Sequence, residues 1–293
     1  MIEKPTVLIL GAGASQPYGL PLGSQLRDSV LRAVDNVEFR SLHQESSGPE
    51  EELSEFALDL ATSGFSSVDA FLEERPQWTG VGKLAMAWCL MGYEQATKAM
   101  LFPPTQPHDH WYETLWATLK SRSWRSFKKQ PLSIITFNYD RSLEHYLVTV
   151  ACNNYSLRPQ TAAAGLPIVH VHGTLGPYDA SNYGGPFDGA ILNEASKSIR
   201  VVHEADVEHS EFVRARQLIS KTERVLFIGF GYLDTNMRKL GFPHEELAGV
   251  VEIAGTSRGI PHNAWRETCR TYGIAPNPAP GAHLADVIAD TLY

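Results

Sequence analysis

The chain has 293 residues, of which 43% are hydrophobic, 20% charged and 10% aromatic, a composition typical of a globular protein and not of a disordered or fibrous one. Its formal net charge is −8, so the molecule as a whole repels nucleic acid and anionic membrane surfaces, and we expect it to bind neither directly. The three cysteines are isolated in the sequence, which excludes a disulfide framework or a paired-cysteine zinc site and favours a cytoplasmic location.

The N-terminus resembles a signal peptide only superficially. The apolar run Val7–Leu10 precedes small residues, but it is far shorter than the roughly 7 to 15 apolar residues of a signal sequence, and Pro5 stands directly before Thr6 and this run. Elsewhere no stretch reaches the ~18 apolar residues that a membrane-spanning helix needs. We therefore expect neither a secretory signal nor a membrane span.

The first third of the chain predicts a strand, a glycine turn and then helices. Residues Thr6–Leu10 form an apolar run typical of a strand buried on both faces, and Ser24 is the expected N-cap of the next helix. The polar residues 41–52 predict an exposed loop, and the segment from Leu53 to Lys120 has helical patterning. Its most apolar part, Val81–Leu101, predicts a long helix that the prolines at 103, 104 and 107 terminate.

Strands and helices alternate in the rest of the chain. The predicted strands are Leu132–Thr136, Ile168–Val171, Val225–Ile228 and Val250–Ala254, and helices are expected from Ser142, from Ser210 and near His283–Leu292. Such alternation predicts an α/β fold with a Rossmann-like parallel sheet and helices on both faces. We expect a single domain spanning residues 1–293, with a helical insertion at about 41–130.

A glycine-rich segment, Gly11–Ser15, follows the first predicted strand. Glycines in this position let the backbone approach a pyrophosphate, which indicates a nucleotide-binding loop; the alternative is a glycine turn without a ligand. The third glycine of the dinucleotide fingerprint is replaced by Gln16, and no strand with a terminal acidic residue follows at the required distance. This pattern argues against an ordinary dehydrogenase.

Polar residues follow the strand predicted at Leu132–Thr136. Asn138 and Asp140 come where ligands bind in open α/β sheets, and the Asn138 amide can hold a ribose hydroxyl or orient a water molecule. The alternative is that both residues only cap the following helix.

Two histidines end the strand predicted at Ile168–Val171. Strand periodicity places His170 and His172 on one face, which allows three interpretations: a metal pair, one catalytic histidine, or a buried structural histidine. A metal site needs further ligands, and the candidates have no supporting spacing: His108, His110, Cys152 and His203. We therefore expect no metal.

The basic segment Lys120–Lys129 contains five cations, Trp124 and Phe127, and no acidic residue. Such a segment can contact phosphates or an acidic partner, but most segments of this kind are solvated surfaces. The net charge of −8 favours the solvated surface.

Several motifs, taken in order, resemble the SIR2-like (sirtuin-related) NADase family of prokaryotic antiphage defence systems. They span about residues 5–256: GAGAS from Gly11, Tyr18–Pro21, Ser67–Leu72, TFNYD from Thr136, HVHGTL from His170, and Leu226–Asn236. The resemblance implies a sirtuin-like fold without the zinc ribbon, because the four zinc cysteines of deacylases are absent.

The resemblance also implies roles for particular residues. Asn138 and His172 would be catalytic, and NAD would be bound as substrate by six others: Ala12, Gly13, Ser15, Asp140, Gly229 and Asp234. Gly19-Leu20-Pro21 is followed by Leu22-Gly23, whereas deacylases continue with Asp-Phe-Arg, so protein deacylation is disfavoured.

The function implied is an NAD+ glycohydrolase that acts as the effector of an antiphage defence system by depleting NAD+. Two alternatives stay open: an NAD-dependent protein deacylase, and a non-catalytic sensor that binds NAD or ADP-ribose. The family implies that the chain forms homo-oligomers and works with a partner protein such as a HerA-type ATPase or an Argonaute, between which no residue here selects.

Overall fold

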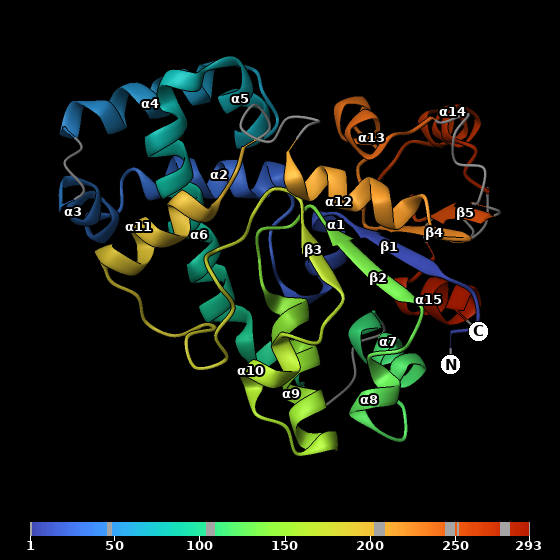
Figure 1. Ribbon diagram of the computed structural model, residues 1–293. Helices are drawn as coiled ribbons and strands as arrows, with labels where there is room; N and C mark the ends of the chain where they lie inside the picture. The colour runs from blue at the N-terminus through green and yellow to red at the C-terminus, as the bar shows by residue number, and fades with distance from the viewer. Residues whose placement is uncertain are drawn as a thin grey trace.

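The computed structural model describes residues 2–45, 49–103, 109–201, 209–243, 250, 252–275 and 282–292. Within these residues lies a sheet of five parallel strands in the order β3-β2-β1-β4-β5 (Figure 1). The strands are β1 (Thr6–Leu10), β2 (Leu132–Thr136), β3 (Ile168–His170), β4 (Arg224–Ile228) and β5 (Glu252–Gly255). This is the strand order of a Rossmann-like sheet, so the predicted α/β fold class is confirmed.

Helices cover both faces of the sheet because its strands are apolar on both faces. In β1, Leu8 and Leu10 pack into the hydrophobic core on one face, and Val7 and Ile9 into the core on the other. The first core is completed by α7 (Trp111–Leu119), α9 (Ser142–Tyr155) and α15 (Leu284–Leu292). The second is completed by α12 (Ser210–Ile219), α13 (Asp234–Leu240) and α14 (His262–Tyr272).

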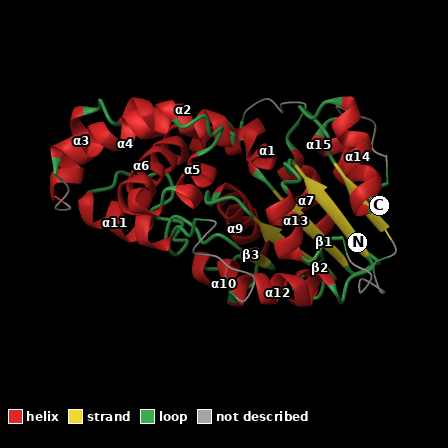
Figure 2. Ribbon diagram, turned by 90° about the horizontal axis from the view of Figure 1, so that it is seen from above, coloured by secondary structure: helices red, strands yellow, loops and turns green. Residues whose placement is uncertain are grey.

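A third hydrophobic core belongs to a group of helices beside the sheet, which we call the helical lobe (Figure 2). Its helices are α2 (Gly23–Ala33), α3 (Val37–Glu45), α4 (Glu50–Thr62), α5 (Val68–Glu74), α6 (Thr79–Thr97) and α11 (Gly189–Ser198). The remaining short helices are α1 (Ala12–Ser15), α8 (Trp124–Phe127) and α10 (Pro159–Ala163), with 3-10 turns at Gln16–Tyr18, Pro76–Trp78 and Lys98–Leu101.

A buried ion pair joins the helical lobe to the loop after β2. The Arg141 Nη2 and Nε atoms lie 2.6 and 3.2 Å from the two carboxylate oxygens of Glu94 in α6, and the Arg141 backbone N–H also donates to Glu94. Both side chains are almost fully buried. Removal of one partner from such a pair is costly because the other charge stays buried, so this contact fixes α6 against the strand end.

Two local predictions in the first third of the chain are wrong. Helix α2 begins at Gly23, with Leu22 and not Ser24 at its N-cap; the Gln25 side chain accepts a hydrogen bond from the Leu22 N–H instead. The polar residues 41–52, predicted as a loop, continue α3 to Glu45 and begin α4 at Glu50, and only 46–48 lie outside the described residues. Their polarity reflects exposed helical faces and not a loop.

The strand predictions are confirmed with small shifts. β1 and β2 have the predicted bounds, whereas β3 ends at His170, one residue early. The helices between β1 and β2 do not form one unit. Helices α2 to α6 belong to the helical lobe, whereas α7 packs on α15 against the sheet. Helix α11, which follows β3 in the chain, also belongs to the lobe. The helical insertion predicted at about 41–130 was a single segment and did not include this division between the lobe and the sheet.

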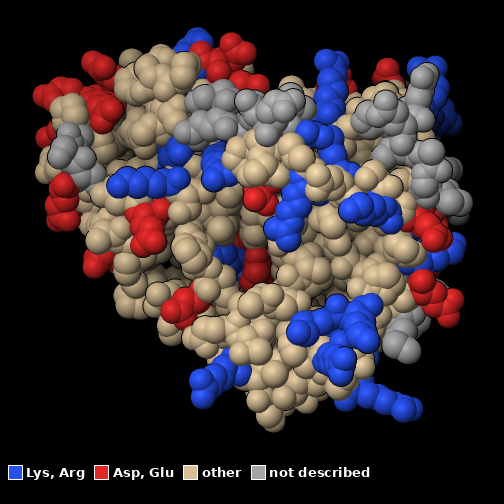
Figure 3. Space-filling view, in the orientation of Figure 1, with Lys and Arg blue, Asp and Glu red and all other residues tan. Residues whose placement is uncertain are grey.

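The aromatic residues of the basic segment point into the sheet core. Trp124 and Phe127 stack at 4.7 Å between ring centroids, and both lie near Tyr155. The cations of this segment are exposed, and Figure 3 shows Lys and Arg side chains gathered over α8. The rings are therefore structural and do not form a stacking surface for bases. Among the described helices, none combines the length and the apolar character required to cross a membrane.

The turns after β1 and β4 meet backbone to backbone. Gly11 and Gly13 donate N–H bonds to the carbonyls of Ile228 and Gly229, each at 3.0 Å. Gly229 has a positive φ of 56°, and a Cβ atom added there would lie 2.0 Å from the Ala14 nitrogen. Only glycine fits this position, because both the backbone conformation and the space exclude a side chain.

We predict that Gly229→Ala lowers the free energy of unfolding by more than about 2 kcal/mol, because it adds backbone strain to a steric clash. Chemical denaturation measures the change. The matched control is Gly92→Ala in α6, where an added Cβ meets no atom within 4 Å and stability rises by up to about 1 kcal/mol. Equal stability of the two variants would contradict the prediction.

Candidate functional site

The candidate site lies at the carboxyl ends of the central strands. From β1 the chain adds β2 and β3 on one side of the sheet, and then β4 and β5 on the other side of β1. Ligands of open α/β sheets bind in the crevice at such a change of side, which here lies between β1 and β4. The turns after β1 and β4, the loop after β2 and helix α5 of the helical lobe surround this crevice.

Two adjoining pockets flank the glycine turn. The first, with a volume of about 300 Å³, is lined by Asp69, Glu73 and Asp140, and we call it the carboxylate pocket. The second, about 480 Å³, is lined by Arg258, and we call it the arginine pocket. Among the described lining residues, the first pocket has no Lys or Arg and the second no Asp or Glu. Arg258 is itself paired with Asp109, at 2.7 Å, so the difference between the pockets lies mainly in the acidic side chains that line the first.

The glycine turn separates these pockets and is held by its own hydrogen bonds. Ala12 lines both pockets, and Gly13 and Gly229 line the arginine pocket. Ser15 is buried behind the turn, where its hydroxyl lies 3.0 Å from the Asn138 amide nitrogen. Ser15 therefore supports the site from behind, and Ala12 and Gly13 are the predicted turn residues that face it.

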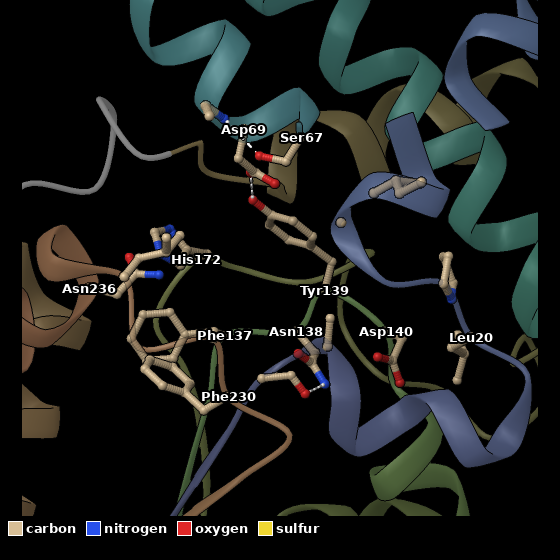
Figure 4. A pocket seen from close by; sticks show the side chains of 18 of the residues that line it. Leu20, Ser67, Asp69, Phe137, Asn138, Tyr139, Asp140, His172, Phe230 and Asn236 are labelled. Atoms are coloured by element: carbon tan, nitrogen blue, oxygen red, sulfur yellow. Dashed lines mark hydrogen bonds between the residues drawn. The ribbon is translucent and has the colours of Figure 1, made fainter. Parts of the chain in front are cut away.

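Asn138 ties the end of β2 to the end of β1. Its amide nitrogen donates to the Gly11 carbonyl and to the Ser15 hydroxyl, both at 3.0 Å (Figure 4). A carbonyl can only accept, so this contact fixes the orientation of the amide, and both amide protons are used. The side-chain oxygen of Asn138 is left as an acceptor in the wall of the carboxylate pocket.

Asp140 lines the same pocket and also holds the start of α9. Its carboxylate accepts from the Ser142 N–H at 3.1 Å and from the Ser142 hydroxyl, which is 2.7 Å from the Tyr112 hydroxyl. Burial raises the pKa of Asp140, and the bonds from Ser142 oppose that shift. The capping and binding interpretations of this residue are therefore compatible, because one carboxylate has acceptor positions for both.

His172 is buried in the wall of the carboxylate pocket among aromatic rings. Its Nδ1 lies 3.2 Å from the Arg200 carbonyl, which can only accept, so the proton is on Nδ1 and Nε2 has the lone pair. Burial, with the nearby charge of Lys239, lowers the pKa of His172 to about 4. The imidazole is thus neutral at pH 7 and can accept a hydrogen bond through Nε2.

His170 has different surroundings from His172, although both were predicted on one strand face. Because β3 ends at His170, His172 lies in the following turn. Nδ1 of His170 lies 2.9 Å from the Asn138 carbonyl, and Nε2 contacts the Glu144 carboxylate. Burial alone would lower the pKa of His170, but Glu144 and the Asn138 carbonyl raise it above its usual value. Both ring nitrogens are occupied, so His170 is a structural residue here.

The ring nitrogens of His170 contact Asn138 and Glu144, whereas Nδ1 of His172 contacts the Arg200 carbonyl. In the described part of the chain there is no group of three or more His, Cys, Asp or Glu side chains that could hold a metal ion. His108 and His203, two of the candidate ligands, lie outside the described residues.

Asp234 points away from both pockets. Its carboxylate accepts hydrogen bonds from the Tyr272 hydroxyl and from Arg238, the latter at 2.9 Å, and the side chain is 66% exposed. Its neighbours Leu233, Thr235 and Asn236 line the carboxylate pocket instead. The predicted loop after Gly229 thus reaches the site, but through residues other than Asp234.

Asp69 and Tyr139 are further site residues, for which the sequence predicted no role. The Tyr139 hydroxyl donates to an Asp69 carboxylate oxygen at 2.5 Å, across the carboxylate pocket (Figure 4). Burial raises the pKa of Asp69, and the bond from Tyr139 opposes the shift. The signal was present in the sequence: Val68, Phe71 and Leu72 form an apolar helical face, which leaves Asp69 on another face.

Asn236 of α13 is a further site residue that the sequence did not indicate. It lines the carboxylate pocket together with His172 (Figure 4), and its side-chain oxygen is buried without a hydrogen-bond partner among the described residues. Buried acceptors are normally paired, so an unpaired one in a pocket wall indicates a ligand with a hydrogen-bond donor.

Comparison with known proteins adds no assignment: no family model matches the chain, and no curated protein shows significant similarity to it.

We predict that the free energy of unfolding depends on pH through His172. The pKa of His172 in the folded chain, about 4, lies below the usual 6.5. The contribution of His172 to the free energy of unfolding is therefore complete above pH 6.5 and is lost as the pH falls toward 4. By linkage this loss of stability is on the order of 3 kcal/mol. In the His172→Gln variant this part of the pH dependence should be absent. Denaturation at pH 7 and pH 4, and NMR titration of the imidazole, measure the effect; titration near 6.5 would contradict it.

Proposed function

We propose that this chain is an NAD+ glycohydrolase that cleaves NAD+ to nicotinamide and ADP-ribose. The observation that carries the proposal is that acidic side chains line the carboxylate pocket, whereas no described acidic side chain lines the arginine pocket on the other side of the glycine turn. NAD+ has a matching distribution, with a cationic ring at one end and an anionic diphosphate between its two riboses. In this proposal the nicotinamide enters the carboxylate pocket and the adenosine enters the arginine pocket.

The chemistry of the reaction fits the residues of the carboxylate pocket. Nicotinamide leaves from a cationic pyridinium and departs neutral, so the reaction needs no general acid. The transition state instead concentrates positive charge on the ribose, which fixed carboxylates and aligned dipoles stabilise. Asp69 and Asp140 supply that negative charge in a partly water-excluded site.

Asn138 and His172 would act on the ribose and the attacking water. The Asn138 side-chain oxygen, a fixed acceptor, would orient a water molecule or a ribose hydroxyl. The neutral His172 would accept a proton or hydrogen bond through Nε2. The unpaired Asn236 oxygen would accept from a donor of the substrate, such as a carboxamide or a hydroxyl.

One incubation separates this function from its two alternatives. Purified protein, alone and assembled with the product of its genomic neighbour, is mixed with NAD+, with and without an acetylated peptide. Free nicotinamide with unmodified ADP-ribose supports the glycohydrolase, and transfer of the acetyl group supports a deacylase. Tight binding without turnover supports a sensor of NAD or ADP-ribose.

We predict that Asn138→Ala and His172→Ala each reduce NAD+ cleavage by at least about 10²-fold, because each removes a group that faces the reacting ribose. Nicotinamide release measures the rate. Asn154→Ala and His262→Ala are matched controls on exposed helical surfaces. Asn138→Ala also loses two hydrogen bonds and about 1 to 3 kcal/mol of stability, so assays are run well below its melting temperature. Turnover at the wild-type rate in either site variant would overturn this mechanism.

The proposed cellular role is that of a cytoplasmic effector of antiphage defence, which stops phage growth by depleting NAD+. An unrestrained NADase would also empty the NAD+ pool of its own host. We therefore propose that assembly, with further copies of the chain or with a partner such as a HerA-type ATPase or an Argonaute, switches the activity on.

We predict that expression of the chain alone at low level leaves cellular NAD+ unchanged, because the assembled state is absent. Co-expression with its genomic neighbour under phage challenge should then lower NAD+ and cell viability. Both quantities are measured in the same cultures, with His172→Ala as the inactive control. Collapse of NAD+ on solitary expression would show that no such switch exists.

A further inference from the structure

The three acidic residues of the carboxylate pocket differ in their hydrogen-bond partners and in their exposure to water. Asp140 is engaged by the N–H and hydroxyl of Ser142. Glu73 is exposed, so water screens its charge. Asp69 is half-buried, and its carboxylate accepts from the Tyr139 hydroxyl at 2.5 Å and from its own backbone N–H. Its charge is therefore less screened by water than that of Glu73, and more accessible to a ligand than that of Asp140, which is buried.

Helix α5 presents Asp69 to the pocket. The Ser67 hydroxyl caps the helix by accepting from the Ala70 N–H at 3.3 Å. Phe71 and Leu72 are fully buried in the core of the helical lobe, which fixes the rotation of this short helix about its axis. Asp69 consequently faces the crevice as a built part of the lobe and not as a flexible surface side chain.

Tyr139 connects this carboxylate to the catalytic side of the pocket. Its hydroxyl lies 2.5 Å from Asp69 and 3.5 Å from the Arg200 carbonyl, the same carbonyl that fixes the His172 ring. The Tyr139 hydroxyl and the Asp69 N–H occupy two of the roughly four acceptor positions of the carboxylate, so the others stay available to a ligand.

We infer that Asp69 is the residue that recognises the positive charge of the nicotinamide ring, so that the helical lobe makes the site selective for the oxidised dinucleotide. This inference rests on the proposed function and adds to it a specificity-determining residue. NAD+ and NADH share every group except the ring, which is cationic in NAD+ and neutral in NADH. A carboxylate at this position distinguishes them by charge alone.

The test compares the binding of two dinucleotides to the full-length chain by calorimetry. The cationic ligand is carba-NAD+, in which a methylene replaces the ribose ring oxygen so that the glycosidic bond is not hydrolysed; the neutral ligand is NADH. We expect the wild-type chain to prefer carba-NAD+. Asp69→Asn, which keeps the shape and removes the charge, should weaken carba-NAD+ binding about tenfold and leave NADH binding unchanged.

Glu74→Gln is the matched control, because Glu74 lies on the same helix but is exposed. It should leave both affinities unchanged. Unchanged NADH binding also shows that Asp69→Asn is folded, and Asp69→Glu, which restores the charge, should recover at least part of the preference for carba-NAD+. Equal weakening of both ligands, or no change in either, would overturn the role of Asp69 while leaving the proposed function in place. Failure of the wild-type chain to bind either ligand would overturn the proposed function itself.

Discussion

The backbone contact between the turns after β1 and β4 is the constraint on which the site depends. Gly13 and Gly229 approach so closely that an added Cβ at Gly229 would lie 2.0 Å from a backbone nitrogen. This approach closes the crevice at its base and leaves one pocket on each side of the turn. The site is therefore elongated and divided, which suits a ligand made of two parts joined by a linker.

Hydrogen bonds then build the rest of the site outward from this contact. Asn138 joins the end of β2 to the glycine turn. The ion pair between Arg141 and Glu94 joins the loop after β2 to α6. Through α5 the helical lobe contributes an acidic side chain on the far side of the same pocket. Charge, and not shape alone, distinguishes the two ends of the crevice, and burial keeps His172 neutral beside the acidic end.

The sequence predicted those parts of the fold that local patterns determine. Continuous apolar runs gave the strands within one or two residues, and the glycine turn, Asn138 and His172 were predicted at the strand ends where the structure has them. Contacts between distant segments were beyond such patterns. The pairing of His170 with Glu144, the burial of Ser15 behind Asn138 and the orientation of Asp234 toward Tyr272 depend on how helices pack. Asp69 lies in the motif Ser67–Leu72, but no role was predicted for it, because nothing in the local sequence relates this short helix to the end of β2.

The order of the strands also bears on when the crevice can exist. β4 begins at Arg224 yet pairs with β1, the first strand of the chain, so the centre of the sheet stays incomplete until most of the polypeptide has left the ribosome. The turn at Gly229 and the side chain of Asn236 arrive later still. A partly synthesised chain thus has the asparagine and the histidine but lacks one wall of both pockets, so the topology itself delays completion of the crevice until translation is nearly finished.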